Sequence, residues 1–218
     1  MKQFASVLLL AASLPATALG QSELTGNLGV TSNYIWRGVT QTDDQAAVQG
    51  GIDYIHETNL YAGVWTSNYG NGNGYELDLY GGYRGTIGEI PFDTGIIMYQ
   101  YPVANTGDDA TEIYGRLDFY LLAATAAFTI DKDGTSQDND LYLSVGSDVD
   151  LGKDRSLTLL LGMYEFDDPA LEDYKHFHAA LKKDEFVFAL DKNDKDRPAN
   201  SDPGEMRVSV SWSRKFEL

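Results

Sequence analysis

The residues best suited to chemistry are charged side chains that stand at every second position of otherwise apolar segments. In YELDLYGGYR, residues 75–84, Glu76 and Asp78 alternate with Leu77 and Leu79. Because successive side chains of a β-strand point to opposite faces, this alternation gathers the charges on one face. The same pattern assigns ten charged residues to such a face: Arg37, Asp53, Glu76, Asp78, Arg84, Glu112, Arg116, Asp118, Asp148 and Arg207.

A charged face can act on an ion or a polar solute when it encloses water. Rings of charge select ions by sign, and opposite charges across a bore orient polar molecules. Acidic residues outnumber basic ones in this set, which predicts a narrow polar channel with a mild preference for cations. In the alternative interpretation, the opposite charges pair with one another and fill the bore.

The segment HFH places two imidazoles, His176 and His178, on one face of a strand. Two imidazoles hold a transition metal when a third ligand is near, and we interpret the pair as ordinary strand residues, with no metal site predicted. They lie opposite Phe177 in register, so they point away from the apolar face. The chain also contains no GxSxG motif. We therefore expect no catalytic residue, no enzyme activity and no cofactor, and a lipid hydrolase is the least favoured alternative.

Twelve segments carry the alternation, and longer acidic loops and shorter turns separate them in turn. Apolar residues rarely recur at helical spacing, and no run of eighteen apolar residues follows the first twenty positions. These features predict an all-β fold, a transmembrane antiparallel up-and-down β-barrel of about 12 strands. The strand boundary near residues 119–123 is the least well defined.

A soluble β-sandwich also alternates, so the aromatic residues must decide between a protein core and lipid. They gather toward strand ends, as expected for two interfacial girdles around a membrane barrel. We therefore expect the apolar face to contact acyl chains. The residues in question are Tyr34, Trp36, Tyr54, Tyr75, Tyr83 and Phe216.

Residues 1–20 have the order of a secretory signal peptide. Lys2 supplies the positive start, an apolar run follows, and small residues lead to cleavage after Gly20 or Ala18. Removal of this peptide leaves the expected barrel domain, residues 21–218.

The net charge of the chain limits the kinds of molecule that it can bind. With 33 acidic and 16 basic residues, the formal net charge is −17 at pH 7, which disfavours nucleic acid. There is no cysteine, so no disulfide framework is available.

The closing strand RVSVSWSRKFEL is apolar at Phe216 and Leu218. This C-terminal strand resembles that of outer-membrane proteins. The barrel assembly machinery recognises the last and third-last residues of those proteins.

The loops carry most of the negative charge. We interpret them as solvated, because they lack the ordered ligand spacing of an EF-hand. In the alternative interpretation, they bind divalent cations that bridge to lipopolysaccharide phosphates. The acidic stretches are Asp43–Asp44, Asp108–Asp109 and residues 131–140, 167–173 and 191–202.

Residues 32–68, SNYIWRGVTQTDDQAAVQGGIDYIHETNLYAGVWTSN, resemble the opening of the TorF-like family of outer-membrane porins. The resemblance implies a barrel in the bacterial outer membrane and pore-forming activity, but no particular substrate or binding residue. We expect a passive channel for small polar solutes, with outer-membrane lipids and lipopolysaccharide as neighbours. A non-conducting structural barrel that presents acidic loops is the main alternative.

Overall fold

The structure is a computed structural model. It describes these parts of the chain: residues 22–70, 74–103, 109–133, 138–195 and 204–218. The predicted signal peptide and parts of three acidic loops therefore lie outside the described residues. No helix in the described ranges is long and apolar enough to cross a membrane.

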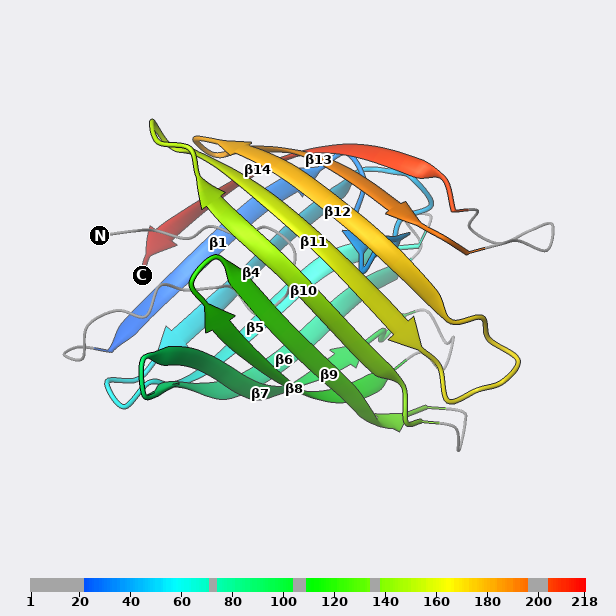
Figure 1. The fold of residues 1–218 in the computed structure, drawn as a ribbon, viewed down its shortest axis with the longest axis horizontal. Helices are drawn as coiled ribbons and strands as arrows, with labels where there is room; N and C mark the ends of the chain where they lie inside the picture. Colours follow the sequence, from blue (N-terminus) through cyan, green and yellow to red (C-terminus); the bar gives the residue numbers. More distant parts are fainter. Residues whose placement is uncertain (1–21, 71–73, 104–108, 134–137, 196–203) are drawn as a thin grey trace.

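Twelve strands of the described chain form a closed antiparallel barrel, which confirms the predicted fold (Figure 1). The strands follow chain order around the barrel, and β1 closes it against β14, with Thr25 opposite Glu217. A separate two-stranded hairpin, β2 (Ile35–Trp36) and β3 (Val39–Thr40), lies between β1 and β4. The barrel strands are β1 (Glu23–Thr31), β4 (Ala47–Ile55), β5 (Leu60–Tyr69), β6 (Gly74–Ile87), β7 (Ile90–Gln100), β8 (Ala110–Phe119), β9 (Leu122–Lys132), β10 (Leu141–Asp150), β11 (Arg155–Glu165), β12 (Tyr174–Lys183), β13 (Phe186–Asn193) and β14 (Met206–Glu217).

The two faces of the barrel wall differ in chemistry. On β11, Leu159 and Leu161 are exposed on the outer face, while the hydroxyl of Thr158 donates to the carboxylate of Asp148 on the inner face. The same division recurs around the barrel, with exposed large apolar residues outside and buried polar residues inside. A water-soluble protein has the opposite distribution. The outer face therefore suits a bilayer, as in bacterial outer-membrane barrels.

The two ends of the barrel differ in the length of their connections. At one end, short turns join β4 to β5, β6 to β7, β8 to β9, β10 to β11 and β12 to β13. The turn between β8 and β9 consists of Tyr120 and Leu121, and Tyr120 has a positive φ of 51°. At the other end, longer segments join β1 to β4, β7 to β8, β9 to β10, β11 to β12 and β13 to β14. Short turns face the periplasm in outer-membrane barrels, so the longer segments are extracellular.

The alternation of the sequence alone predicts a first strand that continues to Arg37, which is longer than the strand in the structure. The sequence alternates from Leu24 to Arg37, but β1 ends at Thr31, and the chain then turns into the barrel. Tyr34 is 5% exposed and lies inside, so it does not belong to an interfacial girdle. Trp36 is also an inner residue, because its ring packs against Tyr99 on the inner face of β7.

The other predicted girdle residues lie on the outer face, and all of them are exposed. They are Tyr54, Tyr75, Tyr83 and Phe216.

Candidate functional site

The main feature of the barrel interior is the segment between β1 and β4, which folds into the extracellular half of the lumen. We call residues 33–45 the lumen hairpin. Its two short strands pair Ile35 with Thr40 and Trp36 with Val39. The turn between them needs two consecutive positive φ angles, 48° at Arg37 and 80° at Gly38, which is the pattern of a type I′ hairpin. Figure 1 shows this small hairpin inside the wall of long strands.

Side-chain hydrogen bonds fix the base of the lumen hairpin. The amide of Asn33 donates to Asp44 at 2.7 Å, and the hydroxyl of Thr40 donates to the Asn33 side-chain oxygen at 2.7 Å. Arg207, on β14, donates from Nε to Asp44 at 2.6 Å. The base is therefore connected to the barrel wall by a charge-assisted hydrogen bond.

The tip of the lumen hairpin reaches the opposite wall through Arg37. Its Nη1 and Nη2 donate to the two carboxylate oxygens of Glu112 on β8 at 2.8 and 2.7 Å, and both side chains are only 4% exposed. The Tyr99 hydroxyl donates to the same carboxylate at 3.2 Å. Bidentate pairs of this kind combine strength with a defined geometry.

Aromatic rings enclose the Arg37 guanidinium. Its Cζ lies 4.1 Å from the ring centroids of both Trp36 and Tyr142, and 5.4 Å from that of Tyr164. Burial alone would lower the pKa of Arg37, but the Glu112 carboxylate outweighs it and holds the pKa above its ordinary value. Arg37 therefore remains a cation inside the barrel.

Gly38 allows the tip to approach β12. A Cβ atom on Gly38 would lie 2.5 Å from the Cβ of His176, which no side chain can tolerate without movement. The Gly38 carbonyl accepts a hydrogen bond from the Asn193 amide at 2.7 Å. Only glycine meets both the positive φ and the close contact at this position.

All ten charged residues predicted for the inner face belong to the barrel interior. Nine come from the wall strands, whereas Arg37 reaches the interior from the lumen hairpin. Arg37, Glu76, Asp78, Glu112 and Arg207 lie in the extracellular half, around the hairpin. Asp53, Arg84, Arg116, Asp118 and Asp148 lie in the periplasmic half.

The four arginines of this set each contact a carboxylate. Besides the Arg37 and Arg207 contacts, Arg84 pairs with Asp93 at 2.9 Å and Arg116 with Asp118 at 2.8 Å. The side chains of Arg116 and Asp118 are 23% and 41% exposed, against 4% for Arg37 and Glu112. The Arg116–Asp118 pair in the periplasmic half is thus more accessible to solvent than the Arg37–Glu112 pair in the extracellular half.

Two inner residues, Tyr61 and Asp93, were not predicted from the sequence. Asp93 receives both the Arg84 contact and a hydrogen bond from the Tyr61 hydroxyl. Asp53 accepts a hydrogen bond from the Tyr80 hydroxyl. Tyrosine is common both in the lumen of this barrel and in the interfacial girdles of membrane barrels. Residue type alone therefore does not tell a lumen tyrosine from a girdle tyrosine. Register separates the two roles, because Tyr80 alternates in phase with the charged residues of β6 and was placed on the inner face for that reason.

His176 and His178 also lie on the inner face. The Nε2 of His176 is 3.0 Å from the Tyr142 hydroxyl, and the Nδ1 of His178 is 2.8 Å from Asp191. Within the described ranges, no group of three or more His, Cys, Asp or Glu side chains is placed to hold a metal ion. His176 and His178 therefore contribute to the hydrogen-bond network on the inner face of the barrel.

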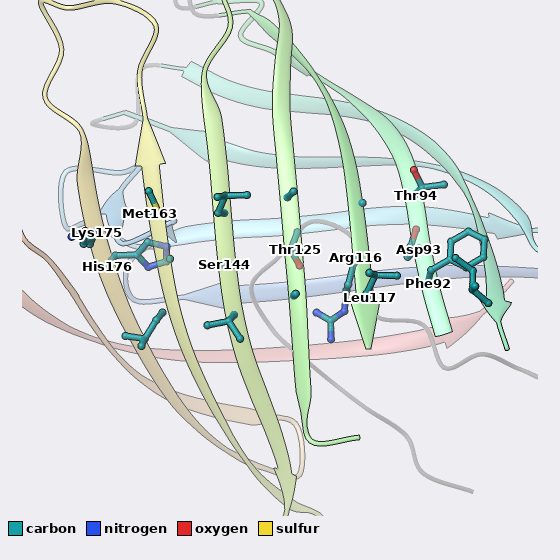
Figure 2. A pocket seen from close by; sticks show the side chains of 18 residues that line it. Phe92, Asp93, Thr94, Arg116, Leu117, Thr125, Ser144, Met163, Lys175 and His176 are labelled. Carbon is teal, nitrogen blue, oxygen red and sulfur yellow. The ribbon is translucent and has the colours of Figure 1, made fainter. Parts of the chain in front are cut away.

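The outer face carries a shallow apolar depression of about 780 Å³ across β6 to β12. Small residues form its floor at Gly115, Ala124 and Ala126, and larger side chains such as Leu117 and Met163 border it. Figure 2 shows that its labelled residues come from neighbouring strands of one side of the wall. It lies on the lipid-facing surface, so it is separate from the lumen.

The last residues of the chain lie at the periplasmic end of the closing strand. Phe216 and Leu218 are exposed, and the Leu218 amide donates to the Leu24 carbonyl at 3.0 Å. Recognition of Phe216 and Leu218 by the barrel assembly machinery stays a prediction.

Comparison with known proteins shows that the chain belongs to a bacterial protein family. Residues 15–195 match the model of a family described as "Bacterial protein of unknown function (Gcw_chp)". No curated protein sequence matches the chain.

Two solved structures share the fold at low sequence identity. One, reported as "Unveiling the Mechanism Behind the in-meso Crystallization of Membrane Proteins", has a TM-score of 0.57 and 7% identity, covering 90% of this chain and 84% of that chain. The other is the KdgM porin in complex with disordered oligogalacturonate, with a TM-score of 0.54 and 7% identity, covering 90% of this chain and 99% of that chain. Both likenesses concern the barrel fold.

Proposed function

We propose that this chain, which belongs to the Gcw_chp family of bacterial proteins of unknown function, is an outer-membrane channel for the passive diffusion of small polar solutes. One observation carries the proposal: a closed barrel with an apolar outer face encloses a polar interior, and a hairpin of the chain narrows that interior. A structural barrel would not need so polar an interior, because apolar side chains fill a lumen at lower cost. The shared fold with a porin supports the same proposal.

We further propose a mild preference for cations. The four arginines of the interior set are matched by Glu112, Asp93, Asp118 and Asp44. Counted over the ten charged residues predicted for the inner face, six carboxylates face four arginines, which is an acidic excess along the inner wall. A negative lumen favours cations over anions of similar size.

A second candidate is a barrel that does not conduct in its resting form. The specific observation in its favour is the burial of Arg37 and Glu112, whose side chains are each 4% exposed at the tip of the lumen hairpin. In this case the barrel would anchor and present its extracellular loops.

Planar-bilayer recording of the purified barrel distinguishes the candidates. We expect the wild type to give small conductance steps, with a reversal potential in a KCl gradient that indicates cation preference. Arg37→Ala should raise the step size, because the hairpin loses its contact with β8. Arg214→Ala, which removes a mostly exposed arginine outside the lumen, is the matched control and should conduct like the wild type.

The outcomes separate clearly. Steps from Arg37→Ala alone would favour the non-conducting resting barrel. If neither the wild type nor Arg37→Ala gives conductance steps, after both are shown to be folded, the channel proposal is contradicted.

We also propose that residues 1–20 direct export and that Phe216 and Leu218 direct barrel assembly. The partners in this proposal are outer-membrane lipids, lipopolysaccharide and the assembly machinery.

A further inference from the structure

The site that holds the tip of the lumen hairpin is built almost entirely by the barrel wall. Tyr99 comes from β7, Glu112 from β8, Tyr142 from β10 and Tyr164 from β11. We call these four residues the cation cage. They supply one carboxylate and three aromatic side chains around a single position, which the Arg37 guanidinium occupies.

The chemistry of the cage fits a planar cation. The Glu112 carboxylate accepts both terminal nitrogens of the guanidinium in a fork-to-fork pair, a geometry that a spherical ammonium cannot reproduce. The Tyr142 ring centroid lies 4.1 Å from the guanidinium carbon, within the range of a cation–π contact. Burial strengthens both contacts, because water competes less for the cation.

The cage recognises the end of the side chain and not its stem. Only Nη1 and Nη2 of Arg37 donate to Glu112, while its buried Nε has no hydrogen-bond partner among the described residues. Any alkylguanidinium presents the same two terminal nitrogens. The contacts therefore do not require that the guanidinium belong to this chain.

We propose that the cation cage is a binding site for solutes that carry a guanidinium group, and that Arg37 occupies it as an intramolecular ligand. The inference rests on the proposed channel, because a solute reaches the cage through the lumen. Such a solute competes with Arg37 and, by taking its place, releases the tip of the lumen hairpin from the wall. A simple structural latch would hold Arg37 equally well, but Arg37 would not give up its place to a free guanidinium compound.

The test uses a barrel in which the cage is vacated. Arg37→Ala is refolded in detergent, and its thermal unfolding is followed by tryptophan fluorescence during titration with methylguanidinium. Methylammonium is the matched probe, since it has the same charge without the planar fork. We expect a saturable rise in the unfolding midpoint, with an apparent affinity for methylguanidinium about tenfold or more above that for methylammonium. The wild type should respond only at higher methylguanidinium concentrations, because the probe must first displace Arg37 from the cage, and no wild-type response at saturating probe would overturn the competition.

Two further variants keep the test decisive. Arg37→Gln replaces Arg37→Ala if the latter does not fold, because its amide can still donate to Glu112. Arg37→Ala combined with Glu112→Gln should lose the selective response, since the carboxylate is gone. Equal responses to the two probes, or an unchanged response in the double variant, would overturn the proposal.

Conductance is read separately. Binding of methylguanidinium in detergent does not depend on conduction. Absent conductance would therefore contradict the proposed channel, while the proposed guanidinium site could still be tested by binding. Conversely, absent binding with normal conductance would overturn the cage alone. If both proposals hold, methylguanidinium reduces the current of Arg37→Ala in bilayers and methylammonium has little effect.

Discussion

Replacing Arg37 by methionine is expected to lower the free energy of unfolding by about 3–5 kcal/mol, because it leaves the Glu112 carboxylate buried without its cation. Both partners are 4% exposed, so water cannot compensate for the loss. The combined change Arg37→Met and Glu112→Leu should recover most of the stability, since no buried charge is then left unpaired. Reversible urea unfolding in lipid vesicles measures both values.

An exposed ion pair provides the control for this prediction. Lys215 and Glu23 are 3.0 Å apart near the barrel rim, with side chains 44% and 34% exposed. Replacing Lys215 by methionine should cost about 0–1 kcal/mol, as surface pairs do. Equal costs at Arg37 and Lys215 would mean that the hairpin tip is not held inside the barrel.

Replacing Leu161 by arginine is expected to destabilise the barrel by about 2–4 kcal/mol, the cost of an arginine on the lipid face near the bilayer midplane. Leu161 lies in the middle of β11, faces outward and pairs with Val145 and Phe177 on the neighbouring strands. A solvent-exposed leucine on a soluble sheet would tolerate the same change.

The matched variant for this second prediction is Leu60→Arg. Leu60 is the first residue of β5 and is also exposed on the outer face, next to a periplasmic turn. Near the interface the same substitution should cost only about 0–1 kcal/mol. If the two variants unfold at the same urea concentration, the outer face does not lie in hydrocarbon.

Period-two alternation made the barrel predictable, because lipid and lumen impose opposite polarity on neighbouring residues of every strand. The register of Glu76 and Asp78 against Leu77 and Leu79 is enough to separate the two faces of β6. The boundary between β8 and β9 was harder to place, because their two-residue turn consists of Tyr120 and Leu121 and has no glycine, proline or asparagine.

The lumen hairpin was not predictable for a different reason. Its residues Asn33 to Arg37 continue the alternation of β1, so local pattern predicts a longer strand. The chain turns inward because of contacts far away in sequence, such as those between Arg37 and Glu112 and between Arg207 and Asp44. The one local signal is the Arg37–Gly38 turn, which is weak without knowledge of the close approach of Gly38 to His176.

The central claim is that neighbouring residues of one strand face an aqueous conducting lumen and lipid in alternation. The chain has no cysteine, so single cysteines at Thr158 and Leu159 of β11 can be compared during bilayer recording with a charged methanethiosulfonate reagent. The account predicts that the reagent changes the conductance of Thr158→Cys and leaves that of Leu159→Cys unchanged. A change confined to Leu159→Cys, or an equal change in both, would contradict it.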